Sequence, residues 1–300
     1  MWSGVIRPPM LPSARSFLKP SAKPDPHPGM HPMTSPASIL LAGCGKMGSA
    51  LMAGWIARGT AAESIFVVDP AEPELPTAVG GGAGINDIPD GFSPAVVVLA
   101  VKPQVMDLVA APYRALVAPN TVFLSIAAGR NIASFEALLS VDAAIVRAMP
   151  NTPAAVGRGI TVLCANAPVS ESQRQTCEAL MAAVGKVAWI DDEGLMDPVT
   201  GVSGSGPAYV FHLVEAMAQA GIDAGLPADL AMLLARETVA GSGELLAQST
   251  DAAATLRENV TSPGGTTAAA LDVLMDDDGL TRLMTKAIGQ ATARSRELAG

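Results

Sequence analysis

The sequence predicts an α/β fold in which a doubly wound parallel sheet is followed by an all-α domain. From residue 38 to 190, short apolar segments of strand length alternate with segments of helical period. This alternation is typical of parallel strands joined by crossover helices. From 191 to 300 the helical period continues and no convincing strand occurs. We therefore predict two folded domains, 38–190 and 191–300.

The composition is typical of a globular protein with an excess of acidic residues. Of the 300 residues, 49% are hydrophobic and 16% are charged, and the formal net charge is −9. This charge disfavours nucleic acid and anionic membranes as partners, and no apolar run approaches the roughly 18–20 residues of a membrane helix. Cys44, Cys164 and Cys177 form neither a CxxC pair nor a Cys/His cluster. We expect a cytoplasmic protein with no metal, no nucleic acid and no membrane partner.

Residues 1–37 differ from the rest of the chain. They contain nine prolines and four basic residues and show no sustained periodicity. Such a segment cannot bury enough apolar surface to order itself. The prolines also interrupt any hydrophobic region of a secretory signal. We predict a disordered, functionally silent Pro-rich tail.

The first domain is predicted to hold seven strands. The run Ala95–Val101 is apolar throughout, as expected of a central parallel strand that is buried on both faces. The Gly-rich segment 80–84 is predicted to be a loop. The predicted strands are 38–42, 64–69, 95–101, 121–126, 143–147, 159–165 and 185–190, and the predicted helices are 46–58, 104–117, 132–139 and one that starts near Ser170.

The second domain is predicted to be entirely helical and to bind a second copy of the chain. Its helices are rich in Ala, Leu and Met, with few charges on any face. Helices that are apolar all round are buried in a larger core or in a subunit contact. We therefore expect an obligate homodimer or a larger ring. The predicted helices are 195–203, 206–224, 228–248, 252–260, 266–276 and 279–298.

A glycine-rich turn separates the first strand from the first helix, in the manner of a Rossmann-type dinucleotide site. One glycine permits the tight turn, the second lets a pyrophosphate approach the backbone, and the third allows close packing of helix on strand. The N-terminus of the helix then offers free N–H groups to that pyrophosphate. The residues are Gly43, Cys44, Gly45, Lys46, Met47 and Gly48.

Asp69 lies 21 residues after Gly48, at the end of the second predicted strand. An acidic residue there accepts a hydrogen bond from the ribose 2′-OH and favours NAD over NADP. Because Pro70 follows, Asp69 could equally cap a turn. The sequence is compatible with both interpretations.

Three further loops follow strands and should lie together at one edge of the sheet. They are Ala100–Gln104, Ser125–Gly129 and Met149–Gly157. Ligands of such sheets bind beyond the carboxyl ends of the strands. Lys102 is therefore a candidate to meet cofactor oxygens or substrate charge, although each loop could also be a simple Gly/Pro connection.

Two stretches of the helical domain are unusually rich in small and hydroxyl residues. In Ser203–Tyr209 (SGSGPAY), small residues before a helix allow close approach of a ligand or another helix. In Asn259–Thr267 (NVTSPGGTT), hydroxyls and glycines stand at the start of a helix. Free N–H groups and the helix dipole make this start a site for a small anion, most naturally a carboxylate. The alternative is an ordinary N-cap, for which one hydroxyl would suffice.

The residues available for acid–base chemistry favour an imine over a ketone as the hydride acceptor. After the tail only His212 and four lysines remain, and His212 is expected to be a core residue. Ketone reduction needs a dedicated general acid. A protonated C=N bond is already an electrophile, so the protein needs mainly to hold donor and acceptor close together.

From about Ser38 to about Ala299 the chain resembles the pyrroline-5-carboxylate reductases. The motifs that carry the resemblance occur in the family's order: the glycine turn, AVKPQ at 100–104, MPNTPA at 149–154, SGSGPAY at 203–209 and SPGGTT at 262–267. The resemblance implies hydride transfer from NAD(P)H to C5 of 1-pyrroline-5-carboxylate, giving L-proline in the last step of proline biosynthesis. It also implies a dimer through the helical domains, often assembled into a decamer, with the active site at the domain junction.

The resemblance also implies roles for individual residues. The cofactor would meet Gly43–Gly48, the turn formed by Ala100, Val101, Lys102 and Pro103, and two asparagines, Asn86 and Asn259. The substrate carboxylate would bind at Ser262, Gly264, Gly265, Thr266 and Thr267, and the Thr267 hydroxyl would contact the carboxylate or the ring nitrogen. These are the residues of the anion site inferred above from the start of the helix.

The sequence departs from the family at one point. Many members end the second strand with Asn-Arg, which suits a 2′-phosphate, whereas this chain has Asp69-Pro70. A carboxylate repels that phosphate, so we expect NADH to be used at least as well as NADPH. Two alternatives remain: a β-hydroxyacid dehydrogenase-like reductase, which would need a Lys and an Asn pair not found here, and a non-catalytic NAD(P) sensor, which would not need the SPGGTT turn.

Overall fold

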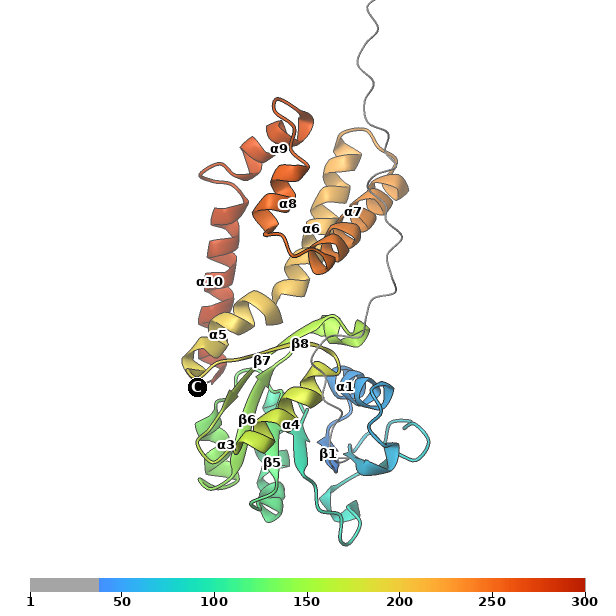
Figure 1. Cartoon of the computed structure of the whole chain (residues 1–300), viewed down its shortest axis with the longest axis vertical. Coiled ribbons are helices and arrows are strands. Elements are labelled where there is room, and N and C mark those ends of the chain that lie inside the picture. The colour runs from blue at the N-terminus through green and yellow to red at the C-terminus, as the bar shows by residue number, and fades with distance from the viewer. Residues whose placement is uncertain (1–37, 300) are drawn as a thin grey trace, which may run out of the picture. The chain divides into compact units, whose positions relative to one another are not determined.

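Within residues 38–299, which the computed structural model describes, eight strands form one sheet in the order β3-β2-β1-β4-β5-β6-β7-β8 (Figure 1). The predicted tail at 1–37 lies outside the described residues. The strands are β1 (Ile39–Ala42), β2 (Ile65–Val68), β3 (Gly80–Gly82), β4 (Val96–Leu99), β5 (Val122–Ser125), β6 (Ala144–Met149), β7 (Gly159–Ala165) and β8 (Gly185–Trp189).

The strand order places a switch point at β1. Ile39 pairs with Ile65 of β2 on one side and with Val96 of β4 on the other, and both pairings are parallel. The chain therefore continues in opposite directions on the two sides of β1, and a crevice at the carboxyl ends of β1 and β4 is where such sheets bind ligands. Only the β6–β7 pairing is antiparallel among the described strands.

Both faces of the sheet are buried, as a doubly wound fold requires. On one face, Ile39 and Leu41 pack with Trp55 of α1 (Lys46–Ala57) and with α4 (Glu171–Ala182). On the other face, Leu40 packs with residues of α2 (Met106–Ala110) and α3 (Ile132–Leu138). The doubly wound α/β prediction is confirmed.

After Trp189 the described chain is helical, as the sequence predicts. Its regular helices are α5 (Met196–Val199), α6 (Gly206–Asp223), α7 (Ala228–Gln248), α8 (Ala253–Asn259), α9 (Thr266–Leu274) and α10 (Leu280–Ala299). A π-helical turn, Thr200–Gly204, joins α5 to α6. Figure 1 shows α6 and α7 as neighbours. Residues 38–299 belong to one compact unit, so the boundary at residue 191 stays a prediction.

Two elements differ from the prediction. The glycines predicted to form a loop at 80–84 include β3, an edge strand paired with Phe66–Val68. A Cβ on Gly82 would lie 2.3 Å from the Asp87 Cβ, so a side chain at this position would require the neighbouring chain to shift. The predicted helix at 104–117 is broken into α2 between two 3-10 turns, because Pro112 cannot continue a regular helix.

Candidate active site

The glycine turn after β1 is shaped to receive a bound group. Gly43 has φ +93°, and a Cβ on Gly48 would lie 2.3 Å from the Gly43 carbonyl oxygen, so the start of α1 lies directly on the turn. A Cβ on Gly45, by contrast, would meet no atom within 4 Å. Gly45 is the N-cap of α1 and no side chain caps that end. Free N–H groups therefore border open space, with Lys46 exposed and Met47 half-buried in the first turn of α1.

The turn that follows β4 adjoins the glycine turn. Ala100 N donates to the Ala42 carbonyl at 2.8 Å. A Cβ on Gly43 would lie 2.9 Å from the Ala100 carbonyl oxygen and 2.8 Å from a Val101 methyl, so the two turns are in contact. Lys102 is exposed and precedes the 3-10 turn that Pro103 begins. Two predicted cofactor segments thus lie together at the switch point.

The Asp69 carboxylate joins the end of β2 to the glycine turn. Its Oδ2 accepts a hydrogen bond from Cys44 N at 2.7 Å, and its Oδ1 accepts one from Ala71 N at 2.9 Å. The turn-cap interpretation is therefore confirmed, and the carboxylate also lies beside the predicted pyrophosphate site. Partial burial, with a smaller contribution from the negative charge of Asp69, raises the pKa of the Cys44 thiol. A raised pKa lowers the fraction of the thiolate, which is the reactive form of a cysteine.

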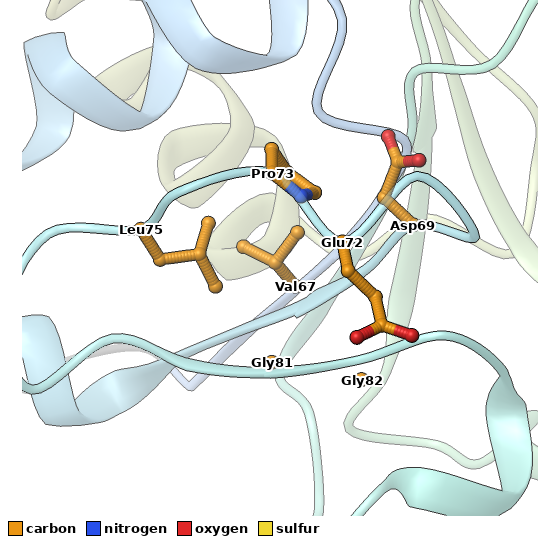
Figure 2. Close-up of a pocket in the computed structure, with 7 residues that line it drawn as sticks. All are labelled: Val67, Asp69, Glu72, Pro73, Leu75, Gly81 and Gly82. Carbon is orange, nitrogen blue, oxygen red and sulfur yellow. The ribbon is translucent and has the colours of Figure 1, made fainter.

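A cavity of about 280 Å³ lies beside Asp69, at the carboxyl ends of β2 and β3 (Figure 2). Val67, Pro73 and Leu75 form the apolar wall of the cavity. Gly81 and Gly82 line it without side chains. Glu72 is the second acidic residue of the lining and was not singled out from the sequence. In Figure 2 its carboxylate points away from that of Asp69 and towards β3. The turn that begins at Asp69 brings Glu72 here, through the bond from Glu72 N to Asp69 O at 3.0 Å.

Asn86 lies in a 3-10 turn, Ile85–Asp87, just beyond the carboxyl end of β3. Asp69 N donates to the Gly82 carbonyl at 3.0 Å, so β3 ends beside β2. Asn86 is therefore on the same edge of the sheet as the glycine turn. No hydrogen bond of its side chain is found among the described residues.

The loops after β5 and β6 reach the helical segment, as predicted for this edge. A Cβ on Gly129 would lie 3.1 Å from the Leu298 Cβ of α10. Asn151 Nδ2 donates to the Ser203 carbonyl at 3.2 Å. Each of these loops follows a strand that runs parallel to β1 and β4.

A largely buried ion pair lies in the same region and was not predicted from the sequence. Arg147 of β6 is 4% exposed, and its Nη1 lies 2.8 Å from Glu193 Oε1. That oxygen also accepts from Ile132 N, at the start of α3, at 2.8 Å. A charged residue within an apolar strand gives no indication of its partner, which lies 46 residues further along the chain.

The SPGGTT stretch forms the turn between α8 and α9. Gly265 is the N-cap of α9, and no side chain caps this end. Gly264 has φ +66°, and Gly265 N donates to the Ser262 carbonyl at 3.0 Å. The hydroxyls of Ser262, Thr266 and Thr267 take part in none of the hydrogen bonds found in the described part of the chain. The turn is thus not an ordinary N-cap, and its donors are available to an anion.

The two halves of the predicted site are not joined by contacts within the described chain. No hydrogen bond or ion pair among residues 38–299 links Asn259 or the turn Ser262–Thr267 to the sheet. Asn259 is the last residue of α8 and is exposed. The structure therefore gathers the glycine turn, Asp69 and Ala100–Pro103, whereas the predicted anion site lies between α8 and α9.

Other residue types that could serve in chemistry lie elsewhere. His212 was expected in the core, but its side chain is 81% exposed on α6, with Nδ1 3.0 Å from Glu215 Oε2. No group of three His, Cys, Asp or Glu residues able to hold a metal occurs in the described part of the chain. None of the described helices combines the length and apolar character needed to cross a membrane.

Comparisons with known proteins identify both parts of the chain. Residues 193–298 match the family model "Pyrroline-5-carboxylate reductase dimerisation", and residues 38–129 match "NADP oxidoreductase coenzyme F420-dependent". The pyrroline-5-carboxylate reductase of Pseudomonas aeruginosa is 40% identical over 266 residues, which cover 87% of this chain and 96% of that protein. The enzyme of Synechocystis is 40% identical over 260 residues, covering 85% and 96%.

Solved structures agree with the sequence comparisons. A pyrroline-5-carboxylate reductase from Coxiella burnetii superposes with a TM-score of 0.81 at 33% identity, covering 89% of this chain and all of that one. The Plasmodium falciparum enzyme, solved with NADP bound, gives 0.73 at 28% identity, covering 88% and 98%. Together with the glycine turn, the switch point at β1 and the uncapped start of α9, these matches show that the chain belongs to the pyrroline-5-carboxylate reductase family.

Proposed function

We propose that the chain binds its dinucleotide along the glycine turn and its substrate carboxylate at the turn Ser262–Thr267. The reaction of the family is hydride transfer from NAD(P)H to the C=N bond of 1-pyrroline-5-carboxylate, giving L-proline. The chain is an oxidoreductase of this type and uses a nicotinamide cofactor. The observation that carries the assignment of the substrate is the start of α9, where unbonded hydroxyls and free N–H groups stand together.

A carboxylate suits the start of α9 better than a phosphate. The turn offers backbone N–H groups, the positive end of a helix dipole and hydroxyl donors. It contains no Arg or Lys from Asn259 to Thr267, and so lacks the cationic fork that a phosphate favours. Thr267 is half-buried on the first turn of α9, where its hydroxyl can donate to the carboxylate or to the ring nitrogen.

The residues of the glycine turn fit a dinucleotide. Gly45 leaves the space that a pyrophosphate needs, and Gly48 lets α1 begin directly on the turn. Ala100–Pro103 and Asn86, on the same edge, and Asn259 complete the proposed contacts. The bound nicotinamide supplies the hydride. The chain's own residues hold the imine acid close to it, and because a protonated imine is already electrophilic they need not provide a dedicated general acid.

Asp69 and Glu72 support the use of NADH at least as well as NADPH. Both carboxylates line the cavity beside the end of β2, where the adenosine ribose of a dinucleotide lies in this fold. A 2′-phosphate placed there would face two negative charges, whereas a 2′-hydroxyl could donate to Asp69. The NADP bound to the Plasmodium falciparum enzyme shows that relatives accept the phosphate, so this preference would be a property of the present chain.

Exposed apolar side chains on the helical segment support a homodimer. Phe211 on α6, Leu233 on α7 and Val273 on α9 are 64%, 55% and 73% exposed in the single chain. Exposed apolar faces of this extent mark a protein–protein interface. Oligomerisation is consistent with the dimerisation family that matches residues 193–298. A dimeric or larger mass by light scattering is expected, and a monomer in dilute solution would exclude the proposal; the same measurement distinguishes a dimer from a decamer.

The test of the function is the loss of absorbance at 340 nm with 1-pyrroline-5-carboxylate and each dinucleotide. We expect oxidation of NADH and formation of proline in equal amounts. Turnover of a β-hydroxyacid with NAD instead would favour the dehydrogenase-like alternative. Dinucleotide binding without turnover of either substrate would favour the sensor.

A further inference from the structure

Asn151 follows β6 and uses both ends of its side-chain amide. Its Oδ1 accepts from Ile160 N of β7 at 3.0 Å, and its Nδ2 donates to the Ser203 carbonyl at 3.2 Å. Ile160 belongs to the sheet, whereas Ser203 belongs to the π-helical turn that precedes α6. One half-buried side chain therefore connects the sheet to the helical segment.

The orientation of this amide is fixed by its partners. The Ile160 N–H requires an acceptor, and the Ser203 carbonyl requires a donor. A flipped amide would place two donors against each other at Ile160 and two acceptors against each other at Ser203. Aspartate, with the same shape, can serve Ile160 but has no proton for Ser203 near neutral pH.

The π-helical turn Thr200–Gly204 is an interruption in an otherwise regular helix. Ser205 N donates to the Thr200 carbonyl at 2.9 Å, one residue further back than in an α-helix. Two carbonyls of the turn accept from side chains instead: Ser203 from Asn151, and Gly201 from the Tyr209 hydroxyl at 3.0 Å. Only the first of these two bonds reaches the sheet.

The same turn packs between the carboxyl end of β6 and α10. A Cβ on Gly204 would lie 2.5 Å from the Met149 methyl, at the end of β6. A Cβ on Gly201 would lie 2.7 Å from Thr292 Oγ1 of α10. The turn is therefore in close contact with both β6 and α10, and it leads directly into α6.

We propose that Asn151 is a positioning residue that aligns the cofactor edge of the sheet with the helical segment. The inference rests on the proposed function, in which the sheet edge holds the hydride donor and the helices carry the acceptor. Hydride transfer requires reacting atoms about 3–3.5 Å apart, and a displacement of about 1 Å can cost about 100-fold in rate. Asn151 acts through the Ser203 carbonyl and not by contact with cofactor or substrate.

The experiment compares Asn151→Asp with Tyr209→Phe in the full-length protein. Each substitution removes one hydrogen bond to a carbonyl of the π-helical turn, but only the first breaks the connection to the sheet. For Asn151→Asp we expect kcat with 1-pyrroline-5-carboxylate to fall about tenfold or more, while the Kd for NADH from fluorescence titration stays within about twofold. For Tyr209→Phe we expect kcat to stay within about twofold of the wild type. Asn151→Ala serves as the second variant if Asn151→Asp does not fold.

Backbone amide exchange over residues 200–205 supplies a readout that is independent of turnover. In Asn151→Asp, the amides of residues 200–205 should exchange faster than in the wild type. The amides of α7 should exchange at the wild-type rate. An unchanged kcat with accelerated exchange would overturn the positioning role, and so would an equal fall of kcat in Tyr209→Phe. If the wild type does not reduce the imine at all, the proposed function fails by itself. Unaltered exchange in Asn151→Asp would show separately that Asn151 does not hold the turn.

Discussion

The pair Gly45→Ala and Gly48→Ala tests whether the glycine turn is built for a ligand. The two glycines lie three residues apart in one turn, and each substitution adds a single methyl group. On Gly45 the methyl would meet no protein atom within 4 Å, whereas on Gly48 it would lie 2.3 Å from the Gly43 carbonyl oxygen. Gly45→Ala should therefore mainly weaken the binding of a ligand, and Gly48→Ala should lower the stability of the fold.

The expected magnitudes follow from this geometry. Gly48→Ala forces a backbone carbonyl to move, and overpacking of this kind costs about 1–3 kcal/mol of unfolding free energy. For a protein of this size each 1 kcal/mol lowers Tm by about 2–4 °C. Gly45→Ala should change the unfolding free energy by no more than about 1 kcal/mol, the cost of alanine at an N-cap. It should weaken NADH binding about tenfold or more, which corresponds to about 1.4 kcal/mol.

The assay is thermal and urea unfolding without ligand, followed by titration of each variant with NADH. Gly59→Ala is not a suitable control, because φ +94° at that position introduces strain of its own. Gly84→Ala is suitable, because its Cβ would meet no atom within 4 Å and its φ is −148°. Wild-type affinity for NADH in Gly45→Ala, or wild-type stability in Gly48→Ala, would refute the assignment of the two roles.

Three further predictions concern dinucleotide choice, the substrate turn and the buried thiol. Asp69→Ser should shift the ratio of kcat/KM towards NADPH, and a strong NADPH preference in the wild type would contradict the reasoning. Thr267→Ala should raise KM for the imine acid while NADH affinity stays near normal; unchanged steady-state kinetics would exclude a contact of that hydroxyl with the substrate. Burial raises the pKa of Cys177 from 9.0 to about 12, so the unfolded thiol ionises first and stability should fall as pH rises from 9 towards 12. Urea midpoints of the wild type and Cys177→Ala at pH 8 and pH 10 test this, and an equal loss in both would assign it to other groups such as Tyr113.

Local sequence patterns predicted most of the secondary structure. The apolar segments give β1, β2 and β4–β8, and the helical periods after residue 191 give α5 to α10. These predictions succeed because strand burial and helical periodicity depend on the pattern of apolar and polar residues that are close in the sequence. They fail at β3, where three glycines look like a loop but form an edge strand, since the strand is defined by its pairing with Phe66–Val68 of β2 and not by side chains of its own.

The residues of the candidate site also differ in whether the sequence could predict them. The glycine turn and the SPGGTT turn were found from the sequence, because each is a short segment whose chemistry lies in consecutive residues. The Arg147–Glu193 ion pair and the Asn151–Ser203 bond were not found, because each joins partners that are distant in the chain, and Glu72 was not found because the cavity that it lines appears only when β2 and β3 pair. Asp69 was left with two interpretations: its bond from Ala71 N is local, whereas its bond from Cys44 N forms only because β2 meets the glycine turn.

The sequence by itself thus determined the fold class, the family and the two turns that carry the proposed chemistry, since all of these depend on local order of residues. The tertiary structure decided which of those segments meet: the glycine turn with Ala100–Pro103 and Asp69, and the end of β6 with the π-helical turn before α6. The physical reason is that hydrogen bonds and steric fit act over a few ångströms in space. Residues far apart in the chain come within that range only when the sheet and the helices are assembled.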